Sequence, residues 1–271
     1  MKNNREKRER NDYMKRKILS FITCFAFIIC FARPVFADTS YSWYFKPTTD
    51  GKQPACTPEA DFVKKYDVIY LGSPDEKKIY LTFDAGYENG NVEKTLDILK
   101  KHNVPAAFFV LPQIVKANTD LVVRMKNEGH LICNHTKSHR NMSKVSDIEV
   151  FREELTLAED ILREHTGFEM DKFYRPPEGA FSETNLAHAM ELGYTTVFWS
   201  LAHADWDDKN QPDPEKSLEK LVNRTHNGCV MLLHPQSKTN ASILEEYIVT
   251  MREKGYEFAS IKELSKSGKK S

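Results

Sequence analysis

The sequence predicts an α/β fold built on one parallel sheet, and two observations support this prediction. Apolar, strand-like runs alternate along the chain with segments whose apolar residues have helical spacing. The cores of these runs lack the polar alternation of a half-exposed strand, as is typical of parallel strands covered on both faces. The 271 residues are enough for one larger α/β domain or two small ones.

Seven strands and six helices are expected in alternation. The strands are predicted at residues 78–84, 106–111, 130–135, 172–176, 195–201, 228–234 and 256–261. The helices are predicted near residues 91–104, 113–129, 146–167, 182–193, 213–227 and 239–255. Ser146 and Ser182 are candidate N-caps, and Gly167 and Gly193 are candidate helix ends. Right-handed crossovers between such strands give either a barrel or an open doubly wound sheet.

Charge is distributed unevenly, although the formal net charge is zero. Residues 1–37 contain nine Lys or Arg against three Asp or Glu, so residues 38–271 carry a net charge of −6. Binding to nucleic acid requires a basic face on the protein. The composition therefore argues against a nucleic-acid partner.

The first 37 residues have the three-part layout of a secretory signal. A basic head precedes the 15-residue apolar run ILSFITCFAFIICFA, and small residues follow up to Ala37. The run is shorter than the roughly 20 residues that span a bilayer. We expect export with cleavage after Ala37, and the long basic head keeps an uncleaved N-terminal anchor as the alternative. In either case the remaining chain is expected outside the cytoplasm.

Three further segments follow the signal. Residues 38–76 are predicted to form an ordered but irregular extension that wraps the main domain, because they are rich in aromatic residues, Pro and Gly. Residues 77–262 are predicted to form the main domain, and residues 263–271 form a basic tail.

The cysteines indicate neither a disulfide framework nor a cysteine metal site. Cys24 and Cys30 lie in the signal segment, and the remaining three are an odd number without C-x-x-C spacing. Cys133 and Cys229 lie within apolar runs, which predicts buried thiols.

Polar residues of chemical interest cluster at the ends of the predicted strands. Asp84, His135, Arg175 and His234 each end a strand, and Asp205 follows another by a few residues. In a parallel β/α fold these carboxyl ends meet at one edge of the sheet, where active sites assemble. The sequence therefore predicts an active site at that edge.

Two histidines of the stretch NHTKSH have spacing that suits a metal site. His135 and His139 are four residues apart, so both imidazoles share one face if a helical turn begins there. Most isolated H-x-x-x-H pairs are surface or capping histidines. The expected position opposite Asp84 favours the metal interpretation.

The other candidates each have a structural alternative. His234 either caps a buried strand or acts as a general acid, since imidazole titrates near neutral pH. Arg175 is expected to pair with a carboxylate, and beside Asp84 it would keep that base ionised and oriented. Asp205 is either a turn residue or the partner that keeps His234 protonated. Trp206 is either a core residue or a sugar platform.

Five short motifs, taken in order, resemble a known family. TFDAG, HTKSH, RPPEG, ADW and LLHP are similar to the motif regions of the NodB-homology polysaccharide deacetylases, the fourth family of carbohydrate esterases. The extension YSWYFK and the stretches TFDAGYENGN, RPPEGAFSE and FWSLAHADW resemble its PdaA-type subgroup, which forms muramic δ-lactam in spore cortex peptidoglycan. The resemblance implies a distorted (β/α) barrel of about seven parallel strands, a divalent metal and removal of acetate from an N-acetylated sugar.

The resemblance also implies roles for four residues of the predicted edge. Asp84 would be the general base, and Arg175 would orient it. His234 would be the acid that protonates the departing amine, and Asp205 would tune His234. These roles agree with the chemistry that the residue types allow.

The remaining implied residues bind the metal or the substrate. His135 and His139 would hold the metal, expected to be zinc, with cobalt or manganese as alternatives. A backbone N–H near Tyr87 or Glu178 would help to hold the developing oxyanion. Trp206 completes the expected substrate-binding set.

The chain departs from most of the family at Ala85, where a second Asp is the usual third metal ligand. Alanine has no lone pair, and catalytic zinc sites usually have three protein ligands, so weak metal binding through two histidines is expected. The PdaA-type subgroup also has a non-acidic residue at this position. Ala85 is therefore interpreted as a subgroup feature rather than as decay of the site.

The predicted function is hydrolysis of the N-acetyl group of N-acetylmuramic acid in peptidoglycan, leading to muramic δ-lactam. The resemblance implies an exported monomer that acts on glycan strands after an amidase has removed the stem peptide. Two alternatives stay open. One is the same reaction on N-acetylglucosamine of peptidoglycan or on chitin-like oligomers, and the other is glycan binding without catalysis.

Overall fold

The structure is a computed structural model that describes residues 38–265. Within these residues, nine strands form the main sheet. They are β4 (Val68–Ile69), β5 (Lys78–Ala85), β6 (Ala106–Val110), β7 (Leu131–Asn134), β8 (Asp171–Tyr174), β10 (Thr195–Val197), β11 (Leu201–Ala202), β12 (Cys229–Leu233) and β13 (Glu257–Phe258). They lie in the order β11-β12-β5-β6-β7-β8-β10-β4, with β13 also paired to β5. All of these pairings are parallel.

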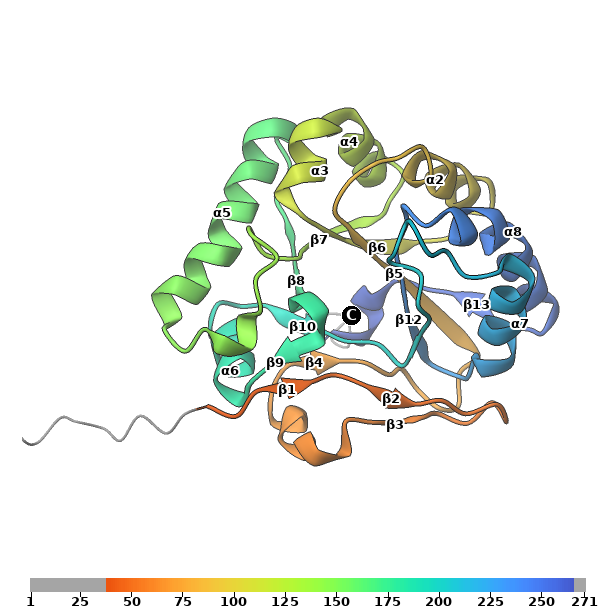
Figure 1. Cartoon of the computed structure of the whole chain (residues 1–271), viewed down its shortest axis with the longest axis horizontal. Coiled ribbons are helices and arrows are strands. Elements are labelled where there is room, and N and C mark those ends of the chain that lie inside the picture. The colour runs from red at the N-terminus through yellow and green to blue at the C-terminus, as the bar shows by residue number, and fades with distance from the viewer. Residues whose placement is uncertain (1–37, 266–271) are drawn as a thin grey trace, which may run out of the picture. The chain divides into compact units, whose positions relative to one another are not determined.

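Helices cover the outer side of this curled sheet (Figure 1). They are α2 (Val92–Lys101), α3 (Pro112–Ala117), α4 (Thr119–Asn127), α5 (Ile148–Thr166), α6 (Glu183–Glu191), α7 (Pro214–Arg224) and α8 (Lys238–Glu253). Ser182 caps α6 as predicted, and Gly167 ends α5 with a φ of 74°. The N-cap of α5 is Asp147 rather than the predicted Ser146, because the Asp147 carboxylate accepts the backbone N–H groups of the first turn. The arrangement confirms the predicted distorted (β/α) barrel.

Two predicted elements are divided in the structure. The helix expected at 113–129 is broken at Asn118, whose φ of −138° and ψ of 48° are not helical. The strand expected at 195–201 becomes β10 and β11 because its backbone changes partners. Phe198 N–H donates to Ile69 O of β4, whereas Ser200 N–H donates to Val230 O of β12. Because β10 pairs with β4 at one end of the strand order and β11 pairs with β12 at the other, this change of partner brings the two ends of the sheet toward each other.

Side-chain alternation along β5 separates two cores. Ile79, Leu81 and Phe83 belong to the larger core between the sheet and the helices. Tyr80 belongs to a second core inside the curled sheet. Because successive side chains of a strand point to opposite faces, Thr82 and Asp84 share the inner face with Tyr80. The general base predicted from the sequence therefore lies on the inner face of the sheet.

The cysteines that the structure describes are free thiols. Cys133 and Cys229 are fully buried, as predicted, and Cys56 is half-buried. The predicted signal segment and most of the basic tail lie outside residues 38–265. No helix within those residues is sufficiently long and apolar to cross a membrane.

The N-terminal extension packs against the chain that leads into the predicted site. Its first strand, β1 (Tyr41–Ser42), pairs antiparallel with β9 (Ala180–Phe181), and β2 (Phe45–Lys46) pairs with β3 (Ala55–Cys56). Trp43 stacks on Phe198 with ring centroids 4.2 Å apart. Its backbone N–H donates to Gly179 O, and its indole N–H donates to Trp199 O, both at 2.8 Å.

Replacing Trp43 with Ala is expected to lower the free energy of unfolding by about 3–5 kcal/mol, because a buried aromatic ring and its hydrogen bond are lost. Trp206, which is 60 % exposed, is the matched control, and Trp206→Ala is expected to change stability by no more than about 0.5 kcal/mol. Urea denaturation measures both. Equal effects of the two substitutions would show that the extension does not stabilise the domain.

Candidate active site

A cavity of about 620 Å³ opens at the carboxyl edge of the sheet and collects most of the predicted residues. Its lining contains the predicted residues Asp84, His135, His139, Glu178, Trp206 and His234. Gly179, Trp199, Ala202, His203, Ala204 and Leu232 complete the wall. Arg175 and Asp205 lie behind this wall, where they contact the residues that line it. The predicted convergence of the strand ends is thus present in the structure.

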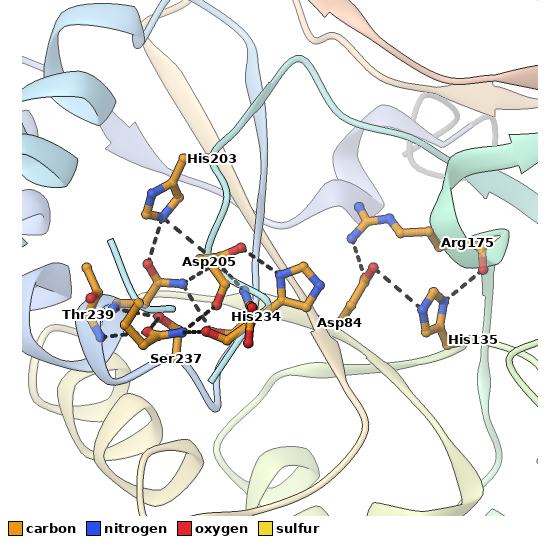
Figure 2. Close-up of polar contacts among 11 residues, drawn as sticks. Asp84, His135, Arg175, His203, Asp205, His234, Ser237 and Thr239 are labelled. Atoms are coloured by element: carbon orange, nitrogen blue, oxygen red, sulfur yellow. Dashed lines mark hydrogen bonds and ion pairs between the residues drawn. The ribbon is translucent and has the colours of Figure 1, made fainter. Parts of the chain in front are cut away.

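Arg175 is fully buried and holds Asp84 in place (Figure 2). Its Nη1 donates to Asp84 Oδ1 at 2.7 Å, and its Nη2 donates to Thr82 Oγ1 at 2.7 Å. Its Nε donates to Val197 O at 3.1 Å, and the guanidinium lies 4.2 Å from the centre of the Phe109 ring. The arginine therefore joins β5, β8 and β10 at the floor of the site.

The surroundings of Asp84 keep its carboxylate ionised. Burial opposes ionisation, but the charges of Arg175, His135 and His234 and the hydrogen bond from Arg175 outweigh it, so the pKa of Asp84 is lowered. An ionised carboxylate with one oxygen held by Arg175 retains acceptor capacity on the other oxygen. Asp84 is thus suited to accept a proton.

His135 is buried and held in one tautomer. Its Nδ1 lies 2.9 Å from the carbonyl oxygen of Arg175, which accepts hydrogen bonds only, so Nδ1 carries the proton. Its Nε2 then has a free lone pair, 3.6 Å from Asp84 Oδ2. Burial lowers the pKa of His135 to about 4, against the opposing charge of Asp84. A neutral imidazole with its second nitrogen fixed by a carbonyl has the form of a metal ligand.

His139 approaches His135 without the helical turn on which the sequence prediction depended. The segment after β7 is a loop in which Thr136 and His139 have positive φ values of 70° and 54°. His139 N–H donates to Thr136 Oγ1 at 3.0 Å, and the His135 and His139 rings have centroids 5.0 Å apart. The predicted pair forms, but a bent loop brings it together because these backbone conformations are incompatible with a helix.

His135 and His139 are the donors of a candidate metal site. Among residues 38–265, no three His, Cys, Asp or Glu side chains form a group able to hold a metal. Ala85 is fully buried and offers no donor. The nitrogens available are those of His135 and His139, one fewer ligand than a typical catalytic zinc site has.

His234 and Asp205 form the second pair of the site. Asp205 Oδ1 lies 2.8 Å from His234 Nδ1, and Asp205 Oδ2 accepts the backbone N–H of His234 at 2.8 Å. Burial alone would lower the pKa of His234, but the hydrogen bond and charge of Asp205, with the charge of Asp84, raise it. His234 is therefore suited to donate a proton from Nε2, which Figure 2 shows on the side of Asp84.

The three predicted substrate-binding residues differ in position. Trp206 is exposed at the cavity, and Glu178 lines it with a φ of 60°. Tyr87 is not among the residues that line the cavity, and its hydroxyl donates to Asp208. Of the two backbone positions proposed for the oxyanion, the turn at Glu178 is thus the one beside the cavity.

Sequence reasoning missed several residues that support the site. Thr82 accepts from Arg175 and donates to Met231 O at 2.6 Å, and its position two residues before Asp84 was the available signal. His203 lines the cavity as well. Asn240 contacts Asp205 from the first turn of α8, a contact that no sequence pattern indicated.

Replacing Arg175 with Met is expected to lower the free energy of unfolding by about 3–5 kcal/mol at pH 7, because Asp84 is left as an unpaired buried charge. The lowered pKa of Asp84 contributes stability above its unfolded pKa of about 3.9. The difference between the variant and the parent protein should therefore narrow as pH falls below about 4.

Denaturant unfolding at pH 7 and at acid pH measures this effect. Arg152→Met is the matched control, because the half-exposed Arg152 pairs with Glu149 on the surface, and it is expected to change stability by no more than about 1 kcal/mol. A constant difference between Arg175→Met and the parent protein across this pH range would contradict the assigned ion pair.

Comparison with known proteins places this chain in a family. The polysaccharide deacetylase family model matches residues 72–197. The peptidoglycan-N-acetylmuramic acid deacetylase PdaA of Bacillus subtilis is 39 % identical over 82 % of this chain and 85 % of its own length. A peptidoglycan-N-acetylglucosamine deacetylase of Bacillus cereus is 32 % identical over 77 % of this chain and 75 % of its own.

Solved structures agree with these matches. The structure of Bacillus subtilis PdaA, a family 4 carbohydrate esterase, superposes with a TM-score of 0.80 at 38 % identity, covering 86 % of this chain and 98 % of PdaA. A family 4 carbohydrate esterase of Bacillus anthracis superposes with a TM-score of 0.68 at 41 % identity, covering 83 % and 96 %. The chain therefore belongs to the polysaccharide deacetylases, the fourth family of carbohydrate esterases, as its motifs suggested.

Proposed function

We propose that this enzyme hydrolyses the N-acetyl group of N-acetylmuramic acid residues in peptidoglycan. The observation that carries the proposal is the pairing of an ionised Asp84 with Arg175 and of His234 with Asp205 around one cavity (Figure 2). The identity with PdaA over most of its length supports the choice of sugar.

Asp84 accepts the proton of the water that attacks the acetyl carbonyl. Its lowered pKa means that it is ionised at neutral pH, and Arg175 fixes the direction in which it accepts. The negative charge that develops on the carbonyl oxygen requires donors at the cavity wall. We assign this role to the backbone N–H of Glu178, because the N–H groups of Gly179 and Ala180 donate within the turn, with Tyr87 as the less well placed alternative.

His234 protonates the sugar nitrogen as the carbon–nitrogen bond breaks. Asp205 fixes the proton on Nδ1 and raises the pKa of the ring, which favours the doubly protonated form that donates from Nε2. The products are acetate and a free amine on the sugar. Trp206, exposed at the cavity, provides an apolar face for the sugar ring.

A divalent metal fits this proposal as a weakly bound cofactor. His135 and His139 would hold it, with zinc expected and cobalt or manganese as alternatives. When bound, such an ion lowers the pKa of water and polarises a carbonyl. The affinity is expected to be low because Ala85 supplies no third ligand.

The substrate proposal includes the state of the glycan. A δ-lactam ring closes between the freed amine and the lactyl carboxyl of the same muramic acid with loss of water, so that carboxyl must no longer carry a peptide. We therefore propose glycan strands without stem peptides, prepared by an amidase in spore cortex, as the partner of an exported, monomeric enzyme. The similarity to the Bacillus cereus deacetylase keeps N-acetylglucosamine as an alternative substrate. The absence of an acidic side chain at Ala85 keeps glycan binding without catalysis as an alternative function.

Acetate release from peptide-free glycan strands is expected, and Asp84→Asn should lower it at least about 100-fold because the general base is lost. A chelator should also lower the rate, and titration with zinc, cobalt or manganese should restore it only at high metal concentration. Enzymatic acetate detection measures each rate.

Peptide-bearing glycan and chitin-like oligomers serve as comparison substrates. A higher rate on either of them would contradict the proposed muramic acid specificity. Glycan binding without acetate release at any metal concentration would support the non-catalytic alternative. Full activity of Asp84→Asn would remove Asp84 from the mechanism.

Asp205→Asn is expected to move the alkaline limb of the pH–rate profile to lower pH. The limb reports loss of the proton from His234, whose pKa is raised by Asp205, so removal of that carboxylate lowers the pKa at which activity disappears. The acid limb, set by Asp84, should stay in place. A profile of kcat/KM against pH measures both limbs, and an unmoved alkaline limb would contradict the assignment of His234 as the acid.

A further inference from the structure

A chain of hydrogen bonds continues from the Asp205–His234 pair into the first turn of α8. We propose that Asn240 and His203 are positioning residues that lock the Asp205 carboxylate, and through it the imidazole of His234, in the orientation needed for proton donation. The inference rests on the proposed function, because it takes His234 as the acid.

Asn240 is buried and contacts both members of the pair. Its Nδ2 donates to Asp205 Oδ2 and to the backbone carbonyl of His234, the latter at 3.1 Å. Both oxygens accept hydrogen bonds only, so the amide must present its nitrogen to them. The Oδ1 of Asn240 is then directed to the opposite side, where it needs a donor.

His203 is that donor. Its side chain is 1 % exposed, and its Nε2 lies 2.8 Å from Asn240 Oδ1. Because Oδ1 only accepts, Nε2 carries the proton. The Nδ1 of His203 is buried and has no hydrogen-bond partner within residues 38–265. The hydrogen bond from His203 Nε2 therefore orients the side chain of Asn240.

The start of α8 is tied to the loop that carries Asp205. Ser237 caps the helix by accepting from Asn240 N–H at 3.2 Å, and its hydroxyl donates to Gln211 Oε1 at 2.6 Å. Gln211 Nε2 donates in turn to Asp205 O at 3.0 Å. Loop and helix thus form one hydrogen-bonded unit, which fixes the distance between Asn240 and the carboxylate.

The consequence is a carboxylate that cannot rotate. Asp205 Oδ2 accepts from His234 N–H and Asn240 Nδ2, which leaves Oδ1 directed at His234 Nδ1. Without Asn240, Oδ2 retains one donor and the carboxylate gains freedom. The hydrogen bond that sets the tautomer of His234 is then weakened, although neither the acid nor its carboxylate has been changed.

Three variants separate this role from simple packing. Asn240→Leu removes the amide, and His203→Phe keeps a ring while removing the donor to Asn240. His203→Gln places an amide nitrogen near the position of Nε2 and restores a donor. We expect kcat to fall about 10-fold in the first two with KM within about twofold, and to recover to within about threefold in His203→Gln.

The second measurement does not depend on turnover. The proton on His234 Nδ1, held by a carboxylate, should give a far-downfield NMR signal in the free protein. This signal is expected in the parent protein and in His203→Gln, and should broaden through solvent exchange in His203→Phe and Asn240→Leu. Ser242→Ala, two residues beyond Asn240 and exposed, is the matched control and should leave both kcat and the signal unchanged.

Thermal unfolding checks that each variant is folded. If Asn240→Leu does not fold, His203→Phe still tests the proposal. An unchanged kcat or an unchanged signal in His203→Phe would overturn the proposal. Equal losses in His203→Gln and His203→Phe would also overturn it, because the ring itself rather than its donor would then be required. Failure of the proposed function differs from these results, since it would leave the parent protein inactive while the signal still responds to the variants.

Discussion

The buried ion pair between Arg175 and Asp84 is the interaction on which the fold and the site jointly depend. A guanidinium with no exposed surface must have its donors satisfied within the protein. Here the acceptors come from Asp84 and Thr82 of β5 and from Val197 of β10, while Arg175 itself follows β8. Three strands must therefore be in register before the charge is neutralised, and the same register places Asp84 at the cavity.

The pair also organises its neighbours. The backbone carbonyl of Arg175 fixes the tautomer of His135, so one residue orients the base through its side chain and a metal-ligand candidate through its main chain. Across the cavity, the carboxylate of Asp205 stabilises the protonated form of His234. The pKa of Asp84 is lowered and that of His234 is raised, so a base and an acid coexist at one pH.

The sequence was sufficient to predict the sheet and the residues at its carboxyl edge, because both depend on short-range signals. Buried runs mark parallel strands, and polar residues at their ends mark the edge where they meet. It was insufficient where the result depends on local backbone conformation or on partners distant in the chain. The break at Asn118, the partner change after Val197 and the loop that brings His139 to His135 are set by backbone conformation and pairing. Asn240 was missed for the same reason, since its partner lies 35 positions earlier.

Ala85 and the neighbouring Asp84 lie in opposite environments, although they are adjacent in one strand. The side chain of Ala85 is fully buried within the core between the sheet and the helices, together with Phe83 and Val110. A carboxylate in that apolar environment would be strongly unfavourable unless a cation compensated its charge. Alanine avoids this requirement and packs within the apolar core. Asp84 does not share this constraint, because Arg175 neutralises it on the opposite face of the strand. The two adjacent positions therefore differ in chemistry: Asp84 is an ionised carboxylate held by Arg175, and Ala85 contributes only apolar packing.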